Sequence, residues 1–180
     1  VSCVVTVSST QARSETVPTL FKNVDVFDSR NAKLRKGMNV LVAGEVVAAI
    51  DDKPIAVPTG AAVIDGTGKT LIPGLIDTHM HIFMSASTRA ELEAAKDPAV
   101  LHASAEREAT NILMRGFTSA RDVGGPVFGL KKKIDSGEIK GPRIYPSGGM
   151  ISQTSGHGDF RATDERSRRW GGKVSAGELM

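Results

Sequence analysis

Cysteine occurs only once in this sequence, as Cys3, which excludes an internal disulfide and a thiolate-rich zinc site. Tyr and Trp also occur once each, so we expect no aromatic platform for stacking bases. No apolar run approaches the roughly 20 residues that cross a bilayer, so no membrane span is predicted. The 23 basic and 20 acidic residues are interleaved and form no basic stripe. We therefore predict no nucleic-acid partner and no membrane span.

Hydrophobic residues make up 40% of the 180 residues and charged residues 24%, as in an ordinary globular protein. Residues 1–12 are first apolar and then small and polar, a pattern typical of the second half of a signal peptide. A frayed leader or a stray strand is the alternative interpretation. We expect residues 1–17 to be a leader or disordered. The predicted localisation is periplasmic or secreted, with a cytoplasmic protein as the alternative.

Short strand patterns separated by tight turns fill residues 18–72. Alternation begins at Leu20, and the runs at 38–43 and 46–50 predict a hairpin because Gly44-Glu45 separates them. Residues 61–65 and 70–72, on either side of Gly-Thr-Gly, predict a second hairpin-like pair. A series of short strands of this kind indicates a small β-sandwich.

Helix and strand patterns alternate from residue 73 to residue 180. A helix is predicted from Asp97-Pro98 to a glycine C-cap at Gly116, with apolar residues at helical spacing between them. Strands are predicted at 117–123 and 143–150, with a short helix at 128–134 between them. Such alternation is typical of a parallel barrel or a doubly wound sheet.

Polar residues occupy every second position near the end of the first strand of this region, as Asp77, His79 and His81. In a strand these three share one face, and Ile76 and Met80 lie on the other. The two histidine Cα atoms would then be roughly 7 Å apart, so both imidazoles could reach one cation. Neutral imidazoles favour zinc or a similar transition metal. The alternative is a pair of exposed or hydrogen-bonded histidines at a strand end.

Two further histidines need separate interpretations. His157 stands between two glycines in the loop at residues 151–160, which follows the third predicted strand. Barrel active sites lie at the carboxyl ends of strands, so His157 is either a substrate contact or an exposed loop residue. His102 lies beside the apolar stripe of the predicted helix, where a surface or packing role is expected.

Three motifs together resemble the amidohydrolase superfamily. The first is Leu-Ile-Pro-Gly-Leu-Ile-Asp-Thr-His-Met-His at residues 71–81, which is similar to the opening signature of that family's metal-binding barrel. Gly-Phe-Thr-Ser-Ala-Arg-Asp-Val-Gly-Gly at 116–125 and Ser-Gly-His-Gly-Asp at 155–159 resemble its imidazolonepropionase-like branch. That branch includes metal-dependent dipeptidases and N-acyl amino acid hydrolases. The resemblance extends from about residue 20 to residue 160.

The resemblance implies a partial (β/α)₈ TIM-type barrel over residues 73–180, after part of a composite β-sandwich over residues 18–72. Such a barrel typically needs about 250 residues, so we expect a piece of a longer protein. His79 and His81 would bind one or two divalent ions, and His157 would face the substrate. The family's bridging lysine, its other histidines and its aspartate base match no residue here, so no catalytic residue is assigned in this chain.

The implied reaction of the longer protein is hydrolysis of an amide or peptide C–N bond by a metal-activated water. The substrate would be a small amide or dipeptide, and the subunit number is left open, with a homo-oligomer allowed. We expect the 180-residue chain to be inactive alone. Two alternatives remain: a deaminase of the same superfamily, and a non-catalytic domain that has lost the metal.

Overall fold

The computed structural model describes residues 17–88 and 98–149, together with residues 151, 153, 156 and 157. The chain divides into two compact units, Val1–Pro73 and Gly74–Met180, and each is described by itself. Residues 1–16 of the predicted leader at 1–17 lie outside the described residues. In the part of the chain that the structure describes, no helix is long and apolar enough to cross a membrane.

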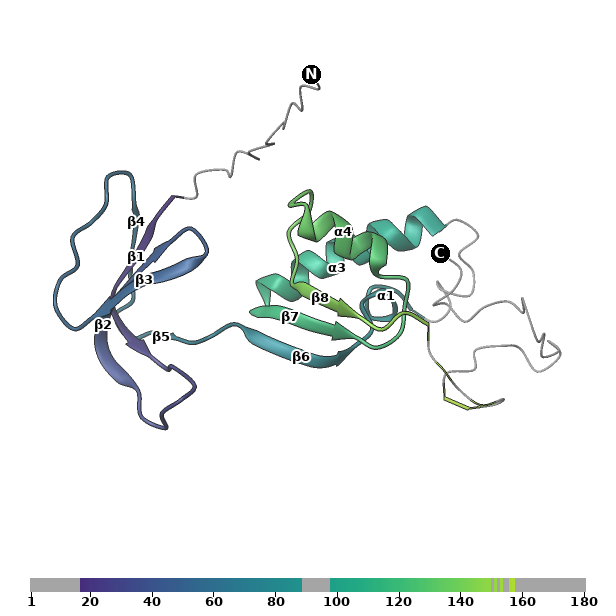
Figure 1. Cartoon of the computed structure of the whole chain (residues 1–180), viewed down its shortest axis with the longest axis horizontal. Coiled ribbons are helices and arrows are strands. Elements are labelled where there is room, and N and C mark those ends of the chain that lie inside the picture. Colours follow the sequence, from purple (N-terminus) through teal and green to yellow (C-terminus); the bar gives the residue numbers. More distant parts are fainter. Residues whose placement is uncertain (1–16, 89–97, 150, 152, 154–155, 158–180) are drawn as a thin grey trace, which may run out of the picture. The chain divides into compact units, whose positions relative to one another are not determined.

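The first unit is a five-stranded sheet in the order β3-β2-β1-β4, with β5 also paired to β1 (Figure 1). The strands are β1 (Thr19–Val26), β2 (Arg35–Ala43), β3 (Val46–Asp51), β4 (Ala62–Asp65) and β5 (Thr70–Leu71). The predicted hairpin is confirmed, because β2 and β3 pair antiparallel. Gly44 turns the chain between them with a φ of 62°, a conformation that glycine adopts without steric cost.

The second predicted hairpin is wrong. Strands β4 and β5 do not pair with each other; both pair with β1, and both run parallel to it. A turn closed by the Lys69 amide on the Gly66 carbonyl separates them. Strand β1 breaks its register beside this turn, between Phe21 and Val24, where Asn23 has a φ of 52°. The bulge in β1 lies beside the turn between β4 and β5. On either side of it, β4 and β5 both pair with β1 in the parallel direction.

The buried side chains of this unit come from the strands of this single sheet. Val24, Val26, Met38 and Val40 are buried, and Leu71 packs against them. The described residues of the unit form no second layer, so the predicted sandwich is represented here by a single sheet.

The second unit is a three-stranded parallel sheet in the order β6-β7-β8 with helices between its strands. Its elements are β6 (Leu75–Met80), α1 (Ile82–Ser85), α3 (Pro98–Met114), β7 (Phe117–Asp122), α4 (Phe128–Asp135) and β8 (Arg143–Pro146). The predicted alternation of parallel strands and helices is therefore confirmed for this segment, as a mixed α/β fold.

Helices α3 and α4 lie on the same side of the sheet (Figure 1) and share one apolar core. Ala105, Ala109 and Ile112 from α3 are buried there, as their helical spacing predicts. Gly116 ends α3 with a φ of 94°, and its amide donates to the carbonyl of Leu113. This capping confirms the glycine stop predicted at that position.

One short helix was missed and one strand was predicted too long. Helix α1 forms at Ile82–Ser85, directly after His81, where no helix was predicted. The third strand was expected to reach residue 150, but β8 ends at Pro146. Proline has no backbone N–H to continue the ladder, and the next amide, of Ser147, donates instead to the carbonyl of Asp122.

Candidate metal centre

His79 and His81 meet at the carboxyl end of β6. His79 is exposed in the strand, and half-buried His81 follows the strand's last residue. Their ring centroids are 5.4 Å apart, with the ring planes at 78°. The structure therefore brings the two imidazoles together, as their spacing predicted.

The backbone between the two histidines is less regular than the sequence indicated. The register of β6 with β7 shifts between Asp77 and Met80, so strict alternation does not hold there. Met80 packs against the apolar core, whereas Ile76 is 67% exposed, so these two residues differ in burial. Asp77 stabilises this irregular part of the strand, because its Oδ1 accepts the backbone N–H of His79 at 2.9 Å.

The His81 ring has a defined hydrogen-bond partner. Its Nδ1 lies 3.0 Å from the carbonyl oxygen of Gly124, in the loop that follows β7. A carbonyl oxygen can only accept, so this contact requires the proton on Nδ1. In the neutral ring, Nε2 then carries the lone pair, which is the form in which histidine binds metals.

Asp122, the last residue of β7, is the one buried charged side chain in the cores of the described residues, with no exposed surface. Its Oδ2 accepts the N–H of Ile82 at 2.8 Å, and its Oδ1 accepts the N–H of Gly124 at 3.1 Å. Burial raises the pKa of the Asp122 carboxyl, while the two backbone donors and the nearby His81 oppose that rise. The sequence offered one signal for this role, an aspartate near the end of the predicted strand at 117–123, two residues before Gly124-Gly125.

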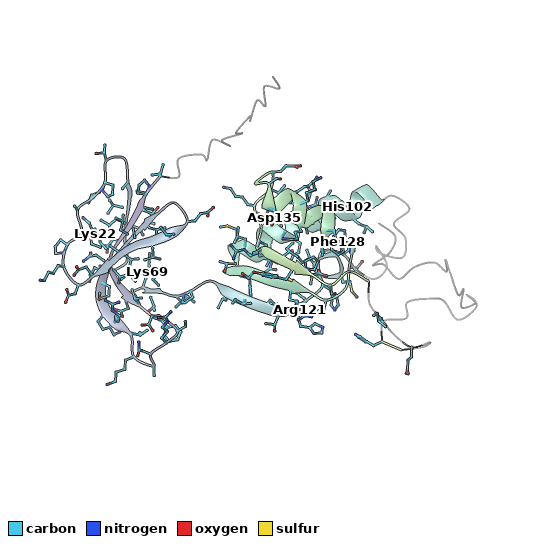
Figure 2. The ribbon with its side chains drawn as sticks, in the orientation of Figure 1. Lys22, Lys69, His102, Arg121, Phe128 and Asp135 are labelled. Carbon is cyan, nitrogen blue, oxygen red and sulfur yellow. The ribbon has the colours of Figure 1, made fainter. Side chains whose placement is uncertain are left out.

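His102 and His157 lie elsewhere. His102 on α3 (Figure 2) packs edge-on against Phe83 of α1, with ring centroids 5.2 Å apart, which agrees with a packing role. His157 is exposed in a turn where the Gly156 amide donates to the carbonyl of Gln153. No described contact joins His157 to His79 or His81, and its role as a substrate contact stays a prediction.

The donor chemistry of the pair suits a transition metal, since both groups are imidazoles and one is fixed with Nε2 free. Catalytic zinc usually has three protein ligands and a water. Over residues 17–88 and 98–149 and the four isolated positions after them, no cluster of three or more His, Cys, Asp or Glu side chains forms. The two histidines are therefore part of a ligand set and not a complete one.

Comparison with known proteins shows the family of this chain. The model of the amidohydrolase family matches residues 70–178, more than half of the chain. Ochratoxinase from Aspergillus niger is 39% identical over 94 residues, which cover 51% of this chain and 20% of the relative. Adenine deaminase from Paracoccus denitrificans is 31% identical over 150 residues, covering 80% of this chain and 24% of the relative.

Solved structures give the same family at greater coverage. A prolidase complexed with N-methylphosphonate-L-proline matches with a TM-score of 0.74 and 33% identity, covering 86% of this chain and 37% of that one. The chain thus spans about a fifth of the length of the ochratoxinases and less than two fifths of that prolidase. These neighbours agree with the imidazolonepropionase-like branch, whose members include dipeptidases. The chain belongs to the amidohydrolase family.

Proposed function

We propose that this chain forms part of a metal-dependent hydrolase that cleaves amide or peptide C–N bonds in small substrates. His79 and His81 are the proposed ligands of a divalent ion, zinc or a similar metal, with one or two ions in the complete site. The observation that carries this proposal is the pair of adjacent rings at the carboxyl end of β6, with His81 held in the metal-binding tautomer. When bound, such an ion lowers the pKa of a water ligand and polarises a carbonyl group.

The proposed architecture is a partial (β/α)₈ barrel over residues 73–180 and part of a composite sandwich over residues 18–72. The parallel order β6-β7-β8 supports it, because helices between parallel strands build such barrels. So does a solved amidohydrolase that matches with a TM-score of 0.75 and 33% identity over 91% of this chain. The remaining strands would come from residues beyond those described.

This chain's own residues would hold and orient groups and would not transfer protons. Asp77 fixes the backbone amide of His79, and the Gly124 carbonyl fixes the ring of His81. His157 is proposed to contact the substrate. The catalytic acid or base and the other metal ligands are assigned to no residue here, so we expect the 180-residue chain to have no hydrolase activity alone.

A dipeptide or an N-acyl amino acid is the proposed substrate class. The prolidase and ochratoxinase neighbours support this choice, since dipeptidases belong to the same branch. Deamination is the second candidate, and the 31% identity with an adenine deaminase favours it. A non-catalytic domain that binds no metal is the third.

Zinc binding by the longer protein that contains this chain, measured by equilibrium dialysis, tests the metal assignment directly. We expect His79→Ala and His81→Ala each to lower the bound zinc clearly, whereas His102→Ala, a histidine that packs on Phe83, should leave it unchanged. Equal binding by all four proteins would refute the metal assignment.

Assays of the longer protein that contains this chain distinguish the reactions. Release of free amino acids from Xaa-Pro dipeptides or N-acyl amino acids, lost on treatment with a chelator, is the expected result. Ammonia release from adenine, without peptide hydrolysis, would favour the deaminase. Zinc-free protein without either activity would favour the non-catalytic domain.

A further inference from the structure

We propose that Asp122 is a positioning residue for His81, because its carboxylate holds the two backbone segments that fix the imidazole. The metal-binding consequence of this inference rests on the proposed function, whereas its effect on the ring itself does not. The chemical state of the site then depends on a residue outside the two histidines.

The carboxylate joins two segments that are far apart in the sequence. Through Oδ2 it accepts the N–H of Ile82, the residue directly after His81, at 2.8 Å. Through Oδ1 it accepts the N–H of Gly124, whose carbonyl is the partner of the His81 ring, at 3.1 Å. One side chain therefore restrains both the backbone that carries the imidazole and the residue that receives its proton.

The loop after β7 needs such restraint because Gly124-Gly125 would otherwise be a freely rotating pair. Gly125 has a φ of 152°, in the region that side-chain-bearing residues rarely adopt. Its N–H donates to the carbonyl of Gly148 at 3.2 Å, which holds the far side of the peptide group whose oxygen faces His81. Asp122 anchors the near side through the Gly124 N–H, so the orientation of the carbonyl is set from both ends.

Asp122 acts through these groups and not on a substrate. It has no exposed surface, and each of its oxygens already accepts a backbone N–H. A carboxylate that is so occupied is poorly placed to bind a metal or to remove a proton. Its effect is on the His81 tautomer: with Gly124 fixed, Nδ1 keeps the proton and Nε2 keeps the lone pair.

The tautomer can be read directly from the ring nitrogens of the ¹⁵N-labelled, metal-free 180-residue chain by long-range ¹H–¹⁵N correlation NMR. At a pH well above the ordinary histidine pKa of about 6.5, the rings are neutral and the two tautomers give different patterns. We expect His81 to be protonated at Nδ1 in the wild-type chain and to shift toward a mixture in Asp122→Asn. Asn presents one acceptor oxygen in place of two, so one of the two N–H bonds must be lost.

Asp135→Asn is the matched control, because this aspartate pairs with Lys131 at 2.7 Å on the surface of α4 and has no contact with the site. Its His81 signals should equal those of the wild type. Far-UV circular dichroism checks that each variant folds, and Asp122→Glu replaces Asp122→Asn if the latter does not. A wild-type His81 protonated at Nε2, or a His81 tautomer unaffected by the Asp122 variant, would overturn the inference.

Zinc affinity of the longer protein that contains this chain, with the same substitutions, separates this inference from the proposed function. We expect about 10–100-fold weaker binding in Asp122→Asn, the usual range for a residue that orients a ligand, and no change in Asp135→Asn. If no protein binds zinc but the Asp122 variant changes the tautomer, the metal function fails and the positioning role stands. If zinc binding needs His81 but is unchanged in the Asp122 variant, the positioning role fails and the metal function stands.

Discussion

Ile112 offers the clearest test of how α3 holds the second unit together. Its side chain is only 1% exposed and lies in the core shared by α3, α4 and the sheet. Replacing a buried Ile by Ala costs about 2–5 kcal/mol, because apolar contacts are lost and a cavity remains. A small domain is stable by only about 5–15 kcal/mol, so the Ile112→Ala change should be prominent.

Urea unfolding followed by the helical circular dichroism signal is a suitable assay, since the described helices all belong to the second unit. A loss of about 3 kcal/mol, with an m-value of about 2 kcal/mol/M, lowers the midpoint by about 1.5 M urea. Met114→Ala is the control because Met114 lies on the same helix and is 79% exposed. Its free energy of unfolding should change by less than about 0.5 kcal/mol. Similar shifts for both variants would refute the described packing of α3.

Three further predictions test other contacts. Gly66→Ala should destabilise the first unit by about 1–3 kcal/mol in thermal unfolding, because the new Cβ would lie 2.6 Å from Val24 Cβ and 3.1 Å from the Lys22 carbonyl oxygen. An unchanged melting temperature would contradict this close packing around Gly66. Gly129→Ala in α4 should stabilise the second unit by about 0.4–1 kcal/mol, because nothing lies within 4 Å of the added methyl group, and a loss of stability would speak against that open space. A hydrogen bond to Glu106, 2.6 Å away, and the negative charge of that residue raise the pKa of Lys133. The pair therefore stabilises the fold fully at a pH below the ordinary lysine pKa, and this stabilisation is lost as the pH rises through the raised pKa. The stability difference between wild type and Lys133→Met should therefore shrink in strongly alkaline urea titrations, and a pH-independent difference would argue against the ion pair.

Local patterns were sufficient to predict most elements of this chain. The spacing of Ala105, Ala109 and Ile112 predicts α3 because each helical turn returns an apolar side chain to the same face. Gly44 and Gly116 mark the turn and the helix stop for a similarly local reason, a backbone conformation with positive φ.

Pairings between distant residues were not predictable in this way. Strands β4 and β5 looked like a hairpin because they are neighbours in sequence, yet both add to the same edge of β1. Helix α1 was missed because its first amide is satisfied by Asp122, 40 residues away in sequence.

In the candidate site, too, the local feature was predictable and the contact between distant residues was not. The spacing of His79 and His81 alone predicts that their rings meet, since only three consecutive residues are involved. The tautomer of His81 depends on Gly124, 43 residues further along the chain, and no sequence pattern specifies that hydrogen bond.

X-ray absorption spectroscopy of the zinc-loaded longer protein tests the central claim most directly, because it counts the imidazoles bound to the ion. At least two histidine nitrogens are expected at about 2.0–2.1 Å from zinc, and one fewer in either His79→Ala or His81→Ala. A zinc environment without imidazole, or one that both substitutions leave unchanged, would contradict it.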